Sequence, residues 1–284
     1  VFGYLAAVAL SVAVMLFGRE INGSKRWLAL GPFSFQPSEF AKVALILFLA
    51  DLVTKNVKTI GKMWTLCRIM FWILPIVGLV GASNLSTAII ILGIGVILIF
   101  VASPKYAQFA LMGIAGACFM GIFLALESYR LERLAIWRNP EKYEKGYQTL
   151  QGLYAIGSGG VFGVGIGNSV QKLGFVPEAQ NDMIFSIICE ELGLAGAGII
   201  VFLFLLLIWR FFLIASGSRD LFGALIATGA MAHMMIQVIL NIAVVTNTIP
   251  NTGITLPFIS YGGTSVMFLL IEMGLVLSVS QVVD

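Results

Sequence analysis

The chain has 284 residues, of which 59% are hydrophobic and 11% are charged, and its mean hydropathy is +0.99. Soluble domains carry roughly 25% charged residues, so this composition excludes a soluble globular domain and indicates an integral membrane protein. The net charge of +3 is spread along the chain, which gives no footprint for nucleic-acid binding.

Apolar stretches long enough to cross a bilayer recur along the whole chain. A helix needs about 20 apolar residues to span a hydrocarbon core of about 30 Å. About eight such stretches are present, near residues 1–17, 38–54, 66–82, 85–103, 106–126, 183–214, 221–245 and 260–282. Segments such as LILFLA and VFLFLLLIW are apolar on every face, unlike the alternating strands of a membrane barrel. We therefore predict an all-α polytopic membrane protein, with one transmembrane domain over residues 1–284.

The first residues, VFGYLAAVAL, lie directly inside an apolar stretch, without an initiator Met or a charged leader. This pattern is not that of a signal peptide, and we expect the natural N-terminus to be missing. Cys67, Cys118 and Cys189 form no C-x-x-C pair, and His233 is the only histidine. The sequence therefore indicates neither a disulfide framework nor a zinc site. For His233 we favour a bond to a neighbouring helix over a proton relay and assign it no catalytic role.

The linkers between the apolar stretches are unequal in length. Most are short and basic, whereas residues 127–181 form a polar segment too long for a simple turn, which we predict to be an extracytoplasmic loop. Both kinds of linker carry cations, so the positive-inside rule does not decide the orientation. The cations of the long loop have two equally weighted explanations: an anionic ligand on that side, or pairing with the neighbouring acidic residues Glu127, Glu132, Glu141 and Glu144.

The long loop also contains GSGGVFGVGIG, residues 157–167. This run lacks a strict G-x-G-x-x-G and follows no strand, so it is a poor dinucleotide fingerprint. Glycines that serve tight turns or a close approach to a ligand fit the run better, and a flexible re-entrant loop fits it equally well.

Four blocks of the sequence, in this order, resemble one known family. They are NGSKRWLALGPFSFQPSEFAK (22–42), YRLERLAIWRNP with GYQTLQGLYAIGSGGVFGVGIG (129–167), PEAQNDMIFSIICEELG (177–193) and NIAVVTNTIPNTGITLPFISYGGTS (241–265). They are similar to the signature blocks of the SEDS family, the RodA and FtsW peptidoglycan polymerases, and ISYGGTS is closer to the FtsW and sporulation branch. The resemblance implies ten transmembrane helices, of which this chain would lack the first two. Asn84 stands in SNLST, where the family has the aspartate of P-D-L-G-T.

The resemblance implies a substrate, a reaction and partners. Family members polymerise lipid II at the outer face of the bacterial cytoplasmic membrane, alongside a class B penicillin-binding transpeptidase. A sugar hydroxyl attacks an anomeric carbon and a lipid pyrophosphate leaves, which requires a base and positive charge. A divalent cation, Mg²⁺ or Mn²⁺, would help the pyrophosphate to leave, although no metal cage is visible in the sequence.

Asp182 matches the family's essential aspartate and is our candidate for the general base. From the residues alone, an N-cap of the following helix explains it better. Glu190 and Glu191 lie about 12 Å further along that helix at 1.5 Å per residue, so we expect them to pair within the bundle.

Seven further residues are candidates for substrate binding. Lys42, inside an apolar helix, needs an acidic partner: Asp182 or the pyrophosphate is one possibility, and an ion pair with Glu39 three residues earlier is the other. Arg26, beside Trp27, could hold pyrophosphate or anchor the chain at the interface. The resemblance adds four more residues from the matching blocks and the long loop: Arg133, Lys172, Ser260 and Gly262.

Two other functions compete with the polymerase. A lipid II flippase or transporter would need charges at the bilayer midplane and often has repeated halves, and a membrane scaffold would need only the helices. No internal repeat is visible, and the candidate residues gather at one mouth of the membrane domain, which favours a polymerase. Cell division is our preferred process, with elongation and sporulation as alternatives.

Overall fold

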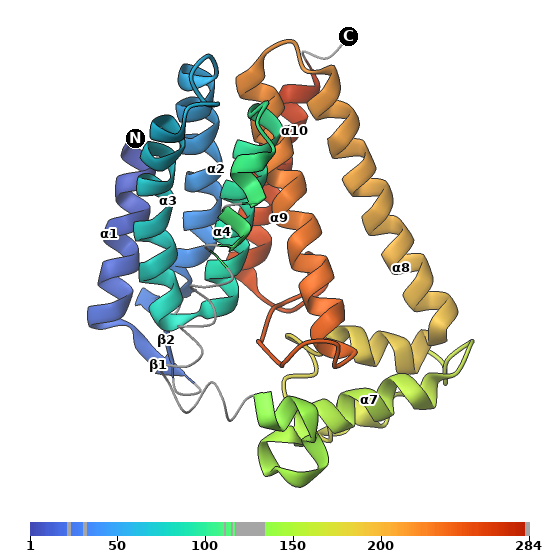
Figure 1. Cartoon of the computed structure of the whole chain (residues 1–284). Helices are drawn as coiled ribbons and strands as arrows, with labels where there is room; N and C mark the ends of the chain where they lie inside the picture. The colour runs from blue at the N-terminus through green and yellow to red at the C-terminus, as the bar shows by residue number, and fades with distance from the viewer. Residues whose placement is uncertain (22–23, 31–32, 111, 115, 117–133, 282–284) are drawn as a thin grey trace. The chain divides into compact units, whose positions relative to one another are not determined.

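The computed structural model describes residues 1–284 except 22–23, 31–32, 111, 115, 117–133 and 282–284. The chain divides into two compact units. Unit 1 comprises residues 1–108, 207–236 and 262–284, and unit 2 comprises residues 109–206 and 237–261. Long helices dominate the structure (Figure 1), which confirms the predicted all-α polytopic class.

Four helices of unit 1 pack together as one group. They are α1 (Phe2–Phe17), α2 (Pro37–Asn56), α3 (Met63–Ser83) and α4 (Leu85–Ala102), and α10 (Gly263–Ser280) also contacts α2. Pro37 starts α2 at the first helical position, where its missing N–H costs no hydrogen bond. The largest fully buried side chains between these helices are aliphatic apart from that of Lys42, and they include Leu45, Leu49, Ile73, Ile91, Ile94 and Leu98.

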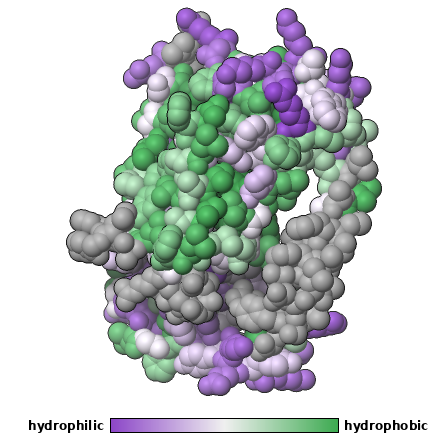
Figure 2. Space-filling view, turned by 90° about the vertical axis from the view of Figure 1, so that its left-hand side faces the viewer, coloured by the Kyte–Doolittle hydropathy of each residue, from purple (hydrophilic) through white to green (hydrophobic). Residues whose placement is uncertain are grey.

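Among the described residues, five helices are long and apolar enough to cross a membrane: α3, α4, α8 (Ile184–Gly217), α9 (Leu221–Val245) and α10. They coincide with five of the predicted stretches. The shorter α1 and the more charged α2 cover the stretches 1–17 and 38–54, whereas most of 106–126 lies outside the described residues. Figure 2 shows the face on which α1 and α3 lie as a broad apolar surface, and exposed Leu5, Phe71 and Leu74 belong to these helices. Such a surface suits lipid contact.

The linker 18–37 forms strands, which we did not predict. Strands β1 (Arg19–Ile21), β2 (Ser24–Leu30) and β3 (Phe33–Phe35) make an antiparallel sheet in the order β1-β2-β3. Trp27 pairs with Arg19, and Leu28 pairs with Phe35. The charges of this linker suggested a loop, but its aromatic and aliphatic residues fit a pleated surface, and pairing on both sides satisfies the backbone of β2.

Unit 2 contains α7 (Tyr147–Gly159), three short 3-10 helices, the first part of α8 and the end of α9. The short helices are η1 (Pro140–Lys142), η2 (Glu144–Gly146) and η3 (Gln171–Leu173). Helix α8 bends at Gly193, whose φ of 67° and ψ of −171° are not helical. Figure 1 shows α7 running across the direction of the long arm of α8 that follows the bend.

The segment after α7 packs against this bend through backbone hydrogen bonds. Val164 N and Gly165 N donate to Glu190 O and Glu191 O, both at 3.0 Å. In return, Leu194 N and Ala195 N donate to Gly160 O and Val161 O, also at 3.0 Å. A bend in a helix leaves amide and carbonyl groups without helical partners, and the neighbouring segment supplies partners for four of them.

Two buried amides on α9 hold the irregular segments of unit 2. Asn241 Nδ2 donates to Asp182 O at 2.9 Å and to Ile254 O at 2.6 Å. One turn earlier, Gln237 Nε2 donates to Thr255 O at 3.1 Å. The accepting carbonyls lie in turns and loops that lack helical partners, so the side chains of one helix replace the missing backbone donors.

We expect Asn241→Leu to destabilise the protein. The leucine keeps a similar volume but leaves two buried carbonyls unpaired, each at a cost of about 1–3 kcal/mol. Asn56→Leu is the matched control: Asn56 Nδ2 also donates to a backbone carbonyl, that of Leu52 at 2.7 Å, but it is only half-buried at the last residue of α2, where water can replace it. Thermal unfolding in detergent should show a clear drop in midpoint for the first variant only, and equal midpoints would contradict this role of Asn241.

A second expectation concerns the bend itself. Gly193→Ala forces an L side chain into a left-handed backbone, and its Cβ would overlap Val161 O and Gly163 N. Gly198→Ala, one turn later in the same helix, meets nothing within 4 Å. We expect the first variant to lose folded yield on size-exclusion chromatography and the second to match the parent protein. A normal yield of Gly193→Ala would mean that the bend tolerates a helical geometry.

Candidate functional site

Asp182 lies in the turn that directly precedes α8, and its side chain is buried. Its Oδ1 accepts a hydrogen bond of 3.4 Å from Gln148 Nε2. The backbone of Gly253 lies next to the other carboxylate oxygen: a Cβ atom added to Gly253 would lie 3.7 Å from Asp182 Oδ2. Together with the bond from Asn241 to its carbonyl, these contacts hold the carboxylate at the start of a membrane-spanning helix.

Gln148 on α7 is a site residue that sequence reasoning missed. Its Nε2 also donates to Pro177 O at 3.3 Å, and its Oε1 accepts from Asn251 Nδ2 at 3.1 Å. One amide therefore joins α7, the turn that carries Asp182 and the loop after α9. The only signal in the sequence is that Gln148 belongs to GYQTLQ, because no spacing rule relates it to an aspartate 34 positions away.

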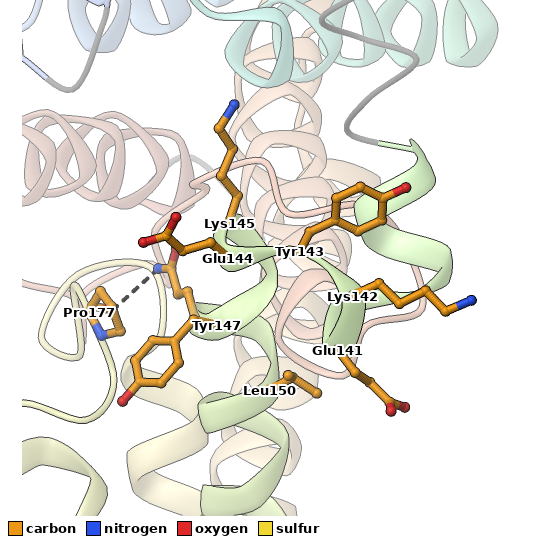
Figure 3. Close-up of a pocket in the computed structure, with 9 residues that line it drawn as sticks. Glu141, Lys142, Tyr143, Glu144, Lys145, Tyr147, Leu150 and Pro177 are labelled. Atoms are coloured by element: carbon orange, nitrogen blue, oxygen red, sulfur yellow. Dashed lines mark hydrogen bonds between the residues drawn. The ribbon is translucent and has the colours of Figure 1, made fainter.

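A pocket of about 670 Å³ adjoins Gln148 (Figure 3). Its lining contains two lysines and two glutamates, so their charges balance. In Figure 3, Glu141 and Lys142 point away from the side on which Pro177 lies. The lining residues are Glu141, Lys142, Tyr143, Glu144, Lys145, Tyr147, Gln148, Leu150 and Pro177. Pairing of these lysines with these glutamates, one explanation for the cations of the long loop, stays a prediction.

Ser260 lies next to the turn of Asp182, and its hydroxyl both donates and accepts a hydrogen bond. The Oγ donates to Asn181 O at 2.7 Å and accepts from Leu256 N at 2.7 Å, and Tyr261 N donates to Gln180 O at 2.9 Å. The ISYGGTS block thus stabilises the turn. Gly262 is the residue before α10 and has extended backbone. Substrate binding by Ser260 and Gly262 stays a prediction.

Glu190 and Glu191 pair within the protein, as expected, and their partners lie in the segment after α7, from Ser169 to Lys172. The carboxylate of Glu190 accepts from Ser169 Oγ and, at 3.1 Å, from Val170 N. Glu191 Oε1 lies 2.5 Å from Lys172 Nζ. Lys172 therefore has an acidic partner within the protein, and its binding to substrate stays a prediction. Arg133 lies outside the described residues.

In unit 1, Lys42 is fully enclosed and forms an ion pair with Glu39. Lys42 Nζ lies 2.8 Å from Glu39 Oε1, and the two side chains are 2% and 8% exposed. The local pair that we considered is therefore present. Asp182 belongs to the other unit, and its pairing with Lys42 stays a prediction.

His233 bonds to a neighbouring helix, as predicted. Its Nδ1 lies 2.8 Å from Oε2 of Glu272 on α10, and both residues are buried. Glu39 interacts electrostatically with His233 as well as with Lys42. We name these four residues, Glu39, Lys42, His233 and Glu272, the buried ionic cluster. Sequence reasoning missed Glu272, although a single glutamate inside FLLIEMGLVL requires a partner in an apolar environment.

Arg26 connects the small sheet to the end of α3. Its Nε donates to Ser83 O at 3.2 Å, which gives the guanidinium a structural contact. A guanidinium has several donors, so this bond is compatible with the predicted contact to pyrophosphate, which stays a prediction.

The described residues do not form a metal cage. Within them, no three His, Cys, Asp or Glu side chains are placed to hold one ion. Mg²⁺ is commonly held by one or two carboxylates together with substrate phosphates. Binding of a divalent cation that arrives with the pyrophosphate therefore stays a prediction.

Comparisons with known proteins identify the family of the chain. The sequence model of the FtsW/RodA/SpoVE family, described as "Cell cycle protein", matches residues 1–284. The chain is 42% identical to stage V sporulation protein E of Bacillus subtilis over 93% of its length, covering 73% of that protein. It is 36% identical to a Thiomicrospira cyclica protein named "Probable peptidoglycan glycosyltransferase FtsW", with 97% and 73% covered.

Two solved structures extend the comparison. A chain from a structure described as "Structural coordination of polymerization and crosslinking by a peptidoglycan synthase complex" is 30% identical, with a TM-score of 0.85 over 98% of this chain and 80% of the other. The rod shape determining protein RodA of Thermus thermophilus is 29% identical, with a TM-score of 0.70 over 98% and 76%. The resemblance drawn from the four sequence blocks is thereby confirmed, and the chain belongs to the FtsW/RodA/SpoVE family, also called SEDS, of multi-pass membrane proteins.

Proposed function

We propose that this chain is a peptidoglycan glycosyltransferase that polymerises lipid II at the outer face of the cytoplasmic membrane. The observation that carries the proposal is the position of Asp182: a buried carboxylate, oriented by Gln148, directly before a membrane-spanning helix. A lipid-linked pyrophosphate places its sugar at the membrane boundary, which is where such a base must lie. The names of relatives that are 36% and 37% identical support the same reaction.

In the proposed reaction, Asp182 accepts the proton of the acceptor hydroxyl as the oxygen attacks the anomeric carbon of the donor. The bond from that carbon to the pyrophosphate breaks, and the pyrophosphate leaves with the electron pair. The amide of Gln148 holds one carboxylate oxygen, so it orients the other toward the proton. Arg26, Lys42, Arg133 and Lys172 are the proposed sources of positive charge for the leaving group.

A lipid II transporter is the second candidate, and the buried ionic cluster favours it. Ionisable residues that pair among transmembrane helices commonly mark transport pathways. A scaffold without catalysis is the third candidate and needs neither Asp182 nor the cluster. Asp182 separates these functions, because a transporter or scaffold does not require a base at the boundary.

We also propose that the chain works beside a class B penicillin-binding transpeptidase. A solved complex that coordinates polymerization and crosslinking contains a chain of similar structure, which supports this partner. Relatives named for sporulation and as FtsW support septal or sporulation synthesis. Localisation of the labelled protein to midcell would favour division.

The first test replaces the proposed base. Asp182→Asn keeps the size of the side chain and removes its basicity, so we expect normal folding and a rate of lipid II polymerisation lower by about 10²–10⁴-fold. Asp51→Asn, at an exposed ion pair with Lys55, is the matched control and should retain activity. Glycan products from labelled lipid II give the rate, and thermal unfolding checks the fold. A normal rate for Asp182→Asn would exclude Asp182 as the base.

The second test separates the charge of Lys42 from its structural pairing. Lys42→Met leaves Glu39 buried without its ammonium partner, which should destabilise the protein by about 3–5 kcal/mol. The double variant Glu39→Gln with Lys42→Met removes both charges and should recover most of this stability. If the ammonium supports catalysis, the stable double variant stays at least about tenfold slower in polymerisation, a loss of about 1.4 kcal/mol. Full activity of the double variant would reduce Lys42 to a structural partner of Glu39.

A further inference from the structure

The segment between α7 and the turn of Asp182 exposes a row of large apolar side chains. We name residues 160–175 the glycine-rich loop. Phe162 and Ile166 are 85% and 81% exposed, and the other exposed members are Val161, Val164, Val170, Leu173 and Phe175. No charged residue interrupts the loop before Lys172, whose ammonium is paired with Glu191. An apolar row of this size in water would be costly, so it requires an apolar environment.

The backbone of this loop is fixed in place. Besides the four hydrogen bonds that join residues 160–165 to the bend of α8, Glu190 and Glu191 bind Ser169, Val170 and Lys172. Gly163 adopts a φ of 78°, and a Cβ there would overlap Glu191 O, so only glycine permits this close approach. The apolar side chains are therefore presented from a defined platform.

The bend also gives the depth of the loop in the membrane. Beyond Gly193, residues 194–217 of α8 extend about 36 Å at 1.5 Å per residue, enough to cross the hydrocarbon core of about 30 Å without the first arm. A long arm that crosses the core by itself puts the bend at the membrane boundary. From this point the long arm exposes Leu194, Ile199, Phe202 and Leu203, a surface that suits only lipid or another apolar helix.

We infer that the glycine-rich loop inserts its apolar side chains into the lipid bilayer at this boundary. Because the loop is hydrogen-bonded to the bend, its apolar row is continuous with the apolar surface of the long arm, and the occupant that covers one surface covers both. Satisfied backbone groups at the bend permit this irregular segment to lie at the edge of the hydrocarbon. Among its polar and charged members, Ser169 and Lys172 bind back to Glu190 and Glu191 of α8, and Asn168 Nδ2 donates to Val164 O within the loop.

The inserted loop would set the position of Asp182 along the membrane normal, an inference that rests on the proposed function. The first arm of α8, residues 184–192, joins the turn of Asp182 to the bend on which the loop lies. A loop anchored in the interface fixes this arm relative to the headgroups, and with it the distance between the carboxylate and a lipid pyrophosphate. Small displacements of a base from its substrate lower the rate strongly.

The depth of the loop can be measured without any assay of activity. In the full chain with its three cysteines replaced, nitroxide labels are attached to Phe162→Cys, Ile166→Cys and Tyr143→Cys, the last at an exposed residue of the pocket rim in the same unit. In proteoliposomes we expect the first two labels to collide more with oxygen than with a water-soluble nickel chelate, and the third to show the reverse. Equal nickel accessibility at all three positions would overturn the insertion. The insertion would also be overturned if the labels at 162 and 166 were accessible to the nickel chelate in liposomes of the chain alone and lost this accessibility only when a partner protein is added.

The positioning role needs a second measurement. Phe162→Asp with Ile166→Asp should lower lipid II polymerisation in liposomes by at least about tenfold, because returning one large apolar side chain to water is worth about that factor. Phe162→Leu with Ile166→Val keeps the row apolar and should retain activity. Both pairs change exposed residues, so the unfolding midpoint in detergent should stay constant. Unchanged polymerisation by the acidic pair would overturn the positioning role, whereas inactivity of the parent protein would refute the proposed function and leave the depth measurement intact.

Discussion

The candidate site depends on one constraint: backbone groups at the edge of a membrane must be satisfied by the protein itself. The turn before α8 and the loop after α9 are irregular, so their carbonyls have no helical donors. Asn241, Gln237, Gln148 and Ser260 supply these donors from side chains. Asp182 is held because its backbone belongs to this network. Each buried carbonyl that loses its donor would lower the stability of the fold by about 1–3 kcal/mol. Rigidity of the candidate base is thus a consequence of backbone pairing.

The same constraint acts on charges inside the helices. Lys42 and His233 would each be expensive in lipid, and each has a carboxylate within 2.8 Å. Their partners differ in origin: Glu39 precedes Lys42 on the same helix, whereas Glu272 comes from α10. Removal of one partner of such a pair costs more than removal of both, because the remaining charge stays buried. The buried ionic cluster therefore adds the ion pair within α2 and the hydrogen bond from α9 to α10 to the packing of these helices.

The sequence predicts the features that depend on local composition. Apolar length located the spanning helices, and the expense of a buried His233 or Lys42 indicated a partner for each. The strands of residues 18–37 escaped prediction because charge was weighed above aromatic content. Gln148 and Glu272 were not predicted because their roles depend on residues that are distant in the sequence. Gln148 on α7 contributes to the site only because the fold brings Asp182 next to it. Local patterns carry no information on such pairings without a structure.

The bend of α8 unites these observations. A straight helix from Ile184 to Gly217 would satisfy its own amides and leave no edge on which residues 160–165 could bind. The left-handed backbone at Gly193 opens that edge, and the neighbouring segment with its own left-handed Gly163 closes it. Two glycines that approach each other thus turn one continuous helix into a short arm that carries the candidate base and a long arm that crosses the membrane. In the proposed arrangement, the backbone geometry where Gly163 and Gly193 meet sets the position of the candidate base relative to the lipid.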